Sequence, residues 1–269
     1  MNVRYYLFCE LLATLWLVSC STAVESPPEV VTIYPTSDTL PENLLRMYIQ
    51  FSSPMKTVGN LEKIQLVDSQ GKEVKGAIFN NVYELWNAEQ TQLTLIFDPA
   101  RVKKGLQVYD SLGPALLVGR EYQLLIEGLE DVTHLPLAES FLKTFVVSAP
   151  DTVPPNPGNW ELAEPKAGSR TPLFITFPTI LDQMSLNTRI LILNDRGEEV
   201  LGDIKVGELE KSIAYVPEVK WQKGQYHIMV HTRLEDPAGN NIRGLFDHPV
   251  GSLRGDHEEE TLDLAFQVE

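Results

Sequence analysis

Short stretches of alternating apolar and polar residues recur along this chain, and each predicts a β-strand with one buried face. At 47–51 the alternation places Met47, Ile49 and Phe51 on one side. The next residues end this strand, since Pro54 cannot continue an interior strand. Similar inward sets are Leu93, Leu95 and Phe97; Tyr122, Leu124 and Ile126; Phe145 and Val147; Leu173, Ile175 and Phe177; and Leu262, Leu264, Phe266 and Val268. Short alternating strands separated by turns predict an all-β sandwich fold.

Two of the strand-turn stretches are near copies of one another. Residues 119–131 and 224–236 each begin with Gly, soon reach a Tyr, and end in Leu-Glu-Asp. The separation between matching landmarks is 126 for Phe51 and Phe177 and for Gly76 and Gly202, 118 for Pro99 and Pro217, and 105 for Asp131 and Asp236. The shortening therefore falls in two connections, one between Gly76 and Pro99 and one at 101–118. Spacing that changes only in connections predicts a duplicated fold.

Two smaller expectations follow from this duplication. Tyr122 and Tyr226 each stand near the start of a strand, shortly after a Gly. This setting predicts a tyrosine corner, in which the hydroxyl bonds to the backbone upstream. The long connection at 101–118 has apolar residues of its own, so we expect it to pack on itself.

The N-terminus has the pattern of a targeting sequence rather than of a folded element. One positive charge, Arg4, precedes a mostly apolar run from Tyr5 to Val18, which is too short to span a membrane. The run ends in Leu17-Val18-Ser19-Cys20, which looks like a bacterial lipobox. The resemblance implies cleavage before Cys20 and lipid chains, such as palmitate, on this cysteine. An ordinary secretory signal is the alternative.

Several motifs resemble bacterial immunoglobulin-like (Ig-like) domains of the S-layer-protein type. They are Phe51-Ser52-Ser53-Pro54-Met55, the Leu-Thr-Leu-Ile-Phe-Asp-Pro run at 93–99, and the Leu-Glu-Asp-Pro-Ala-Gly-Asn run at 234–240. The resemblance implies tandem extracellular sandwich modules without catalysis of their own. We therefore expect a lipoprotein signal peptide at 1–19, a tether at 20–29, Ig-like β-sandwich domains at 30–150 and 159–269, and a Pro-rich linker at 151–158.

Composition and charge narrow the range of partners. The formal net charge is −15, which disfavours nucleic acid and anionic membrane faces, because both attract basic patches. Acidity of this kind keeps a protein soluble, or it serves a bound cation. The two cysteines, Cys9 and Cys20, both lie near the N-terminus, so no disulfide framework crosses the predicted domains.

Two sets of residues are candidates for binding. Asp131, Asp236 and Asn240 stand in the repeated turns, where their side chains either satisfy backbone donors or bind calcium. Trp86, Trp160 and Trp221 either pack in the cores or form platforms on which sugar rings stack. We expect no catalytic residue and no cofactor other than this calcium.

The sequence therefore predicts a non-catalytic, lipid-anchored protein of the cell envelope, at the outer membrane of a Gram-negative bacterium. It would act as an extracytoplasmic binding or scaffold module for a protein or glycan partner. One alternative is a surface glycan-binding lipoprotein that assists polysaccharide degradation. Another is a carboxylate-based hydrolase using the acidic stretch from Asp247 to Glu260, in particular Asp256 or Glu258.

Overall fold

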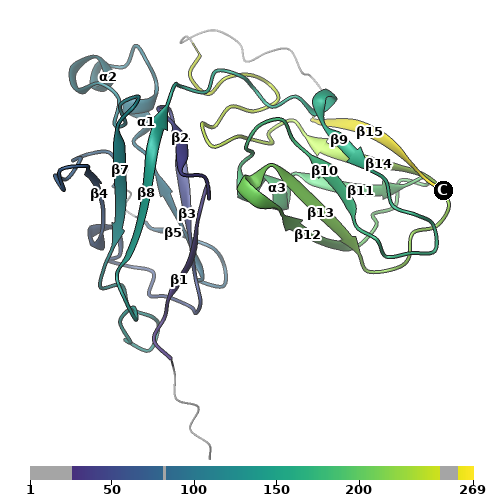
Figure 1. Cartoon of the computed structure of the whole chain (residues 1–269), viewed down its shortest axis with the longest axis horizontal. Helices are drawn as coiled ribbons and strands as arrows, with labels where there is room; N and C mark the ends of the chain where they lie inside the picture. Colours follow the sequence, from purple (N-terminus) through teal and green to yellow (C-terminus); the bar gives the residue numbers. More distant parts are fainter. Residues whose placement is uncertain (1–25, 81–82, 249–259) are drawn as a thin grey trace, which may run out of the picture.

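The computed structural model describes residues 26–80, 83–248 and 260–269. In this part of the chain the strands form four sheets, which face one another in pairs and make two sandwiches (Figure 1). The sandwiches lie side by side, and the chain crosses between them once, after β8. The fold is all-β, as the alternating pattern predicts.

The first sandwich joins a sheet of order β1-β3-β6-β5 to one of order β2-β8-β7-β4. The strands are β1 (Val30–Tyr34), β2 (Thr39–Pro41), β3 (Arg46–Phe51), β4 (Ile64–Asp68), β5 (Leu85–Trp86), β6 (Gln92–Ile96), β7 (Glu121–Ile126) and β8 (Phe141–Ser148). Neighbouring strands are antiparallel, except that β2 runs parallel to β8. Three short helical segments lie in the connections: η1 (Leu61–Lys63), α1 (Pro99–Val102) and α2 (Gln107–Leu112).

The second sandwich repeats this connectivity, with sheets of order β9-β10-β13-β12 and β11-β14-β15. Its strands are β9 (Glu161–Ala163), β10 (Leu173–Thr176), β11 (Ile190–Asn194), β12 (Gly202–Val206), β13 (Ser212–Pro217), β14 (Gly224–His231) and β15 (Thr261–Val268). Its helical segments are η2 (Pro157–Asn159), α3 (Gln183–Thr188) and η3 (Glu208–Glu210). In chain order both sandwiches have the A-B-E-D and C-F-G arrangement of the Ig fold. The two halves are therefore like-connected, and the Ig-like prediction is confirmed.

The likeness of the halves extends to individual hydrogen bonds. Asp68 Oδ1 accepts two N–H groups of its turn, and Asn194 Oδ1 does the same at the matching position. The Tyr122 hydroxyl accepts the N–H of Leu117, and the Tyr226 hydroxyl bonds both backbone groups of a residue four positions upstream. Both tyrosine corners are therefore confirmed.

The inward sets predicted from alternation form the two cores, with one exception. Met47, Ile49 and Phe51 are buried, and so are the matching sets on β6, β7, β8 and β10. Leu262 and Leu264 are only half-buried, since β15 is an edge strand of its sheet. The connection at 101–118 packs on itself, because the Arg101 guanidinium donates to the carbonyls of Gly113 and Pro114 within it. The same guanidinium also donates to the Lys75 carbonyl outside it.

Polar contacts join the two sandwiches. The Tyr48 hydroxyl on β3 donates to Asp182 Oδ2 at 2.7 Å, and Arg46 pairs with Glu235 at 2.8 Å. The Leu45 N–H donates to the Pro237 carbonyl at 2.9 Å. These bonds hold β3 and the residue before it against two turns of the second sandwich, one before α3 and one after β14. We refer to them as the β3 clasp.

A second group of contacts lies farther along the same junction. Glu210, which is buried, accepts the N–H and the hydroxyl of Thr36 at 3.0 and 2.7 Å. Leu209 and Glu210 both have a φ of 52°, in the left-handed region that is strained for residues other than glycine. This strained turn carries the Glu210 carboxylate across the junction. Burial, opposed by the bonds from Thr36, raises the pKa of Glu210 above its usual value.

The predicted tether and linker are both tied to the folded body. The Pro28 carbonyl accepts the N–H of Ala138, and the Glu29 N–H donates to Ser52 Oγ. The tether predicted to reach residue 29 therefore ends by Pro28. At the Pro-rich linker, the Asp151 carbonyl accepts the side-chain amides of Asn43 in one sandwich and Asn240 in the other. No helix within the described residues is long and apolar enough to cross a membrane.

Candidate functional site

The connections from β3 to β4 and from β4 to β6 together build a cleft in the first sandwich. It has a volume of about 480 Å³, and its two walls are residues 57–62 and the segment with Asn80, Tyr83, Glu84 and Trp86. In the second sandwich the matching chain forms β12 and returns through η3 to β13. The first sandwich is longer here, as the 126-to-118 change in landmark spacing indicates. The second sandwich also has a hollow, of about 340 Å³, beside β11 and β12, with Tyr215 as its one aromatic lining residue, so what distinguishes the first copy is the pair Tyr83 and Trp86.

Glu84 ties the two walls of the cleft together. Its Oε1 accepts the N–H groups of Asn60 and Leu61, and its Oε2 accepts the Asn60 side-chain amide at 2.7 Å and the Trp86 indole N–H at 3.0 Å. Burial raises the pKa of Glu84, but these hydrogen bonds outweigh it and leave the pKa below the usual 4.5. The carboxylate stays ionised and fixes Asn60 beside Trp86.

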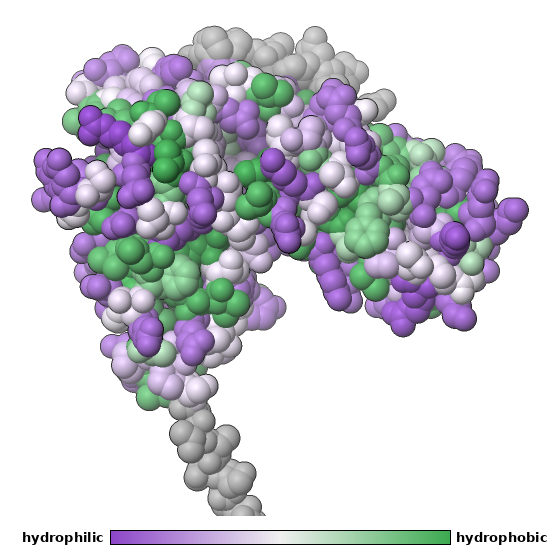
Figure 2. Space-filling view, in the orientation of Figure 1, coloured by the Kyte–Doolittle hydropathy of each residue, from purple (hydrophilic) through white to green (hydrophobic). Residues whose placement is uncertain are grey.

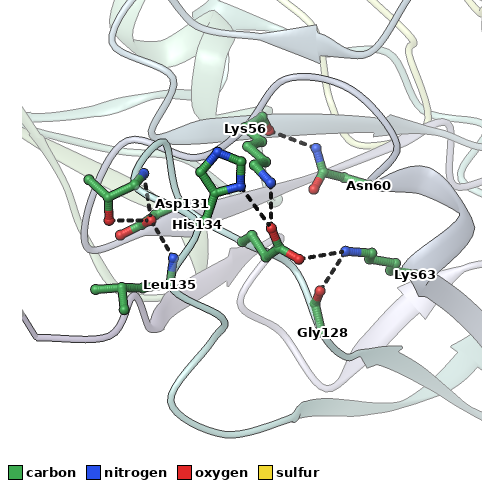
Figure 3. A network of polar contacts seen from close by, with 9 residues as sticks. Lys56, Asn60, Lys63, Gly128, Asp131, His134 and Leu135 are labelled. Carbon is green, nitrogen blue, oxygen red and sulfur yellow. Dashed lines mark hydrogen bonds and ion pairs between the residues drawn. The ribbon is translucent and has the colours of Figure 1, made fainter.

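A second carboxylate holds the other side of the same wall (Figure 3). Glu130 forms ion pairs with Lys56 and, at 4.0 Å, with Lys63, while His134 lies 3.7 Å away. Lys63 also donates to the Gly128 carbonyl at 2.7 Å. The wall formed by residues 57–62 is thus held at both sides. Glu84 bonds to Asn60 and Leu61 within it, and Glu130 pairs with Lys56 and Lys63, which flank it.

Replacing Glu84 with Gln tests the first of these ties. We expect a loss of about 1 kcal/mol in the free energy of unfolding at neutral pH, because a half-exposed, charge-assisted acceptor becomes an amide that can no longer accept four donors. A group with a lowered folded-state pKa stabilises above its unfolded pKa and loses that contribution as the pH falls through the folded value. The difference between wild type and Glu84→Gln should therefore shrink below about pH 4.5.

Urea unfolding curves at several pH values measure this difference. Glu62→Gln is the matched control, since Glu62 lines the same cleft but is exposed. We expect the control to stay within about 0.5 kcal/mol of wild type. Equal effects of the two substitutions at every pH would contradict the role assigned to Glu84.

The three tryptophans named as sugar platforms lie in different settings. Trp86 lines the cleft and packs against Phe51, with ring centroids 5.6 Å apart. Trp160 is half-buried and meets Phe177 edge-on at 4.7 Å. Trp221 is only 1% exposed and donates its indole N–H to the Thr171 carbonyl at 2.8 Å. Trp221 is a core residue without a free ring face, so the platform prediction is wrong for it.

The turn residues proposed as calcium ligands bond to their own backbone. Asp131 Oδ1 accepts the N–H groups of Thr133 and Leu135, and Asp236 Oδ1 accepts those of Ala238 and Asn240. The remaining oxygen, Asp236 Oδ2, accepts the Asn240 side-chain amide at 2.9 Å. Both carboxylates close the same turn, which is the alternative that the sequence left open.

Asp236 is also electrostatically unusual. Burial and the nearby charge of Asp151 raise its pKa well above the usual 3.8, against the hydrogen bonds that favour ionisation.

Within residues 26–80, 83–248 and 260–269, no group of three or more His, Cys, Asp or Glu is placed to share a metal ion.

Other predicted residues lie partly or wholly outside the described residues. Asp247, at the start of the acidic stretch, accepts the Lys104 N–H at 3.1 Å across the junction between sandwiches. Asp256 and Glu258, named for the hydrolase alternative, lie outside the described residues, as does Cys20. Tyr83 and Glu84 were not among the predicted site residues. The signal that could have found them is the length difference between the two copies.

Comparison with known proteins supports no closer assignment. No family model and no curated protein matches the chain. Among solved structures, an α-2-macroglobulin fragment from Escherichia coli aligns over 90% of this chain and 71% of its own length, with 10% identity and a TM-score of 0.28. The S-layer protein SbsC aligns over 91% of this chain and 41% of its own length, with 8% identity and a TM-score of 0.33. The Ig1-2 module of a Drosophila receptor protein tyrosine phosphatase has 14% identity and a TM-score of 0.26. At these scores the likenesses carry no argument about function.

Proposed function

We propose that this chain is a non-catalytic, lipid-anchored protein of the cell envelope that holds a binding surface in place outside the cytoplasm. The observation that carries the proposal is the β3 clasp, in which the buried Tyr48 and Asp182 and the half-buried Arg46 and Glu235 bond across the two sandwiches. A junction of this kind makes a stiff spacer, because relative motion would break the hydrogen bond between the Tyr48 hydroxyl and Asp182. A scaffold needs such stiffness to present a surface at a fixed distance from its anchor.

The sequence named Asp131 and Asp236 as calcium ligands, and Asp247 begins the stretch named for a hydrolase. Asp131, Asp236 and Asp247 each accept backbone N–H groups in turns or across the junction. These bonds give the three carboxylates a structural role, while Asp256 and Glu258 lie outside the described residues. The cleft beside Trp86 then supplies the binding surface.

The stiffness of the body is tested by amide ¹⁵N relaxation. If the clasp holds, β7 and β14, in different sandwiches, should give the same rotational correlation time. Clearly shorter and unequal times for the two strands would show independent tumbling and would count against a scaffold.

The lipid anchor is supported by the lipobox-like residues 17–20 that follow the apolar run. We expect cells that express the full chain to incorporate an alkyne fatty-acid analogue into it, and Cys20→Ala to abolish both the label and retention in the membrane fraction. Stable anchoring is expected because several acyl chains each contribute about 0.8 kcal/mol per buried CH₂. Cys9→Ala is the control and should keep the label. Fractionation into inner and outer membranes decides which membrane holds the protein, and an unlabelled wild-type chain would refute the anchor.

A further inference from the structure

We propose that the cleft between residues 57–62 and the Tyr83–Trp86 segment binds a neutral carbohydrate chain. The inference deepens the proposed binding role by naming a ligand class, and it rests on that role. It starts from the comparison of the two sandwiches. In one copy the matching chain returns through β12 and η3 beside a hollow whose one aromatic residue is Tyr215, and in the other it is longer and adds Tyr83 and Trp86 to the cleft. Extra length in a surface connection is where a stable scaffold gains a site.

The cleft exposes apolar surface of a particular kind. The Tyr83 side chain is 78% exposed, and Val58, on the opposite wall, is 83% exposed. Trp86 completes the aromatic pair, and its contact with Phe51 holds the indole in one place. Sugar rings present C–H faces that stack on aromatic rings, so two aromatic residues with an aliphatic residue opposite suit a pyranose chain.

Polar groups stand beside this apolar surface. The Thr57 hydroxyl, the Asn80 amide and the Glu62 carboxylate line the cleft, and they match the alternating donors and acceptors of sugar hydroxyls. Glu84 already accepts four hydrogen bonds and therefore serves the wall rather than the ligand. The acidic lining and the net charge of −15 repel anionic chains, so the ligand that fits is a neutral one.

The wall formed by residues 57–62 is also ordered before any ligand binds. Glu84 holds Asn60 and Leu61, while Glu130 holds Lys56 and Lys63 (Figure 3). A wall that is already ordered loses little conformational entropy when a ligand binds. This matters for carbohydrate, because each stacking contact is weak and a mobile wall would offset it.

The exposed surface of the first sandwich offers a competing candidate. Figure 2 shows apolar side chains gathered on the visible face of this half. On β8, Leu142 and Val146 are exposed. Leu142 lines a hollow of about 280 Å³ with polar neighbours, but Phe141 is its one aromatic residue, so it lacks the tyrosine and tryptophan of the cleft. No feature of this patch identifies a ligand, so the cleft is the better candidate for the binding site.

The test is a titration of the chain from residue 21 onward with a panel of neutral hexasaccharides: β-1,4-linked glucose, mannose, xylose and N-acetylglucosamine, and α-1,4-linked glucose. Binding is measured by calorimetry and by saturation-transfer NMR. We expect at least one to bind with a micromolar to millimolar Kd and Tyr83→Ala to weaken it about tenfold or more. Tyr83→Ala should leave the unfolding temperature unchanged, since the side chain is exposed.

Phe174→Ala is the matched control, because Phe174 is an exposed aromatic residue on β10 of the other sandwich. It should bind the hexasaccharide as wild type does. The proposal is overturned if no member of the panel binds at millimolar concentration, or if Tyr83→Ala and Phe174→Ala behave alike. It is also overturned if a lysine-rich peptide, run in parallel, binds in a Tyr83-dependent way while the saccharides do not. Lipid labelling and ¹⁵N relaxation give their results independently, so failure here leaves the scaffold proposal standing.

Discussion

Trp221→Ala should destabilise the second sandwich by about 3–5 kcal/mol, the largest effect expected for any single substitution named for this protein. The indole is 1% exposed and meets Tyr226 and Phe266 edge-on, with ring centroids 5.1 and 6.0 Å away. Its removal leaves a cavity among these rings and also leaves the Thr171 carbonyl without the indole donor. The free energy of unfolding of a whole domain is only about 5–15 kcal/mol, so this substitution would remove much of the stability of the second sandwich.

Native-state hydrogen exchange of β14 and β7 amides measures this loss for each sandwich separately, which matters because two joined sandwiches need not unfold in one step. Trp160→Ala is the control for losing an indole. Trp160 is half-buried at the edge of the same core, so its loss should cost less than about 2 kcal/mol. A Trp221→Ala protein with β14 exchange within about 1 kcal/mol of wild type would contradict the core assignment.

The same residue shows what sequence pattern can and cannot provide. Alternation identified the inward sets on β3, β6 and β7, because which face of a strand is buried is encoded locally, every second residue. Trp221 lies in the approach to β14, outside any alternating run. Its burial depends on aromatic partners from separate strands, and no local period encodes such a meeting.

Tyr48 is a second residue whose burial the local pattern does not predict. It stands between Met47 and Ile49, so alternation places its side chain on the outer face of β3. It is nevertheless buried, because the second sandwich covers that face and Asp182, 134 positions away, accepts a hydrogen bond from its hydroxyl. A single sequence contains no signal for this pairing. Burial and the charge of Asp182 also raise the pKa of Tyr48 above its usual value.

The cleft could be predicted from the sequence in part. The landmark spacing located the extra length between Gly76 and Pro99, and Trp86 was named from its residue type. What the spacing could not supply was that Glu84 would join Asn60 across the cleft, or that Tyr83 would be left exposed at its rim. Loop conformation depends on such cross-bonds more than on pattern. Comparing the lengths of duplicated connections nevertheless directs attention to the right segment.

The second large effect is expected at the β3 clasp. Asp182→Ala should lower the free energy of unfolding by about 2–4 kcal/mol and release the two sandwiches from each other. Asp182 Oδ1 caps α3 by accepting the Ser185 N–H at 2.8 Å, and Oδ2 accepts the Tyr48 hydroxyl at 2.7 Å. Alanine removes the cap and leaves a buried hydroxyl without its acceptor. ¹⁵N relaxation should then show shorter correlation times, different for β7 and β14.

The duplication provides the control for this experiment. Lys56 holds the position in the first sandwich that Asp182 holds in the second, since each donates its N–H to the carbonyl of the Glu in the repeated Leu-Glu-Asp turn. Lys56→Ala removes only a surface contact with Glu130 and should cost less than about 1 kcal/mol while the sandwiches still tumble together. A double-mutant cycle of Tyr48→Phe with Asp182→Asn should give a coupling of about 0.5–3 kcal/mol. No measurable coupling, or unchanged relaxation in Asp182→Ala, would mean that the clasp is not what fixes the two halves, and the scaffold proposal would lose its support.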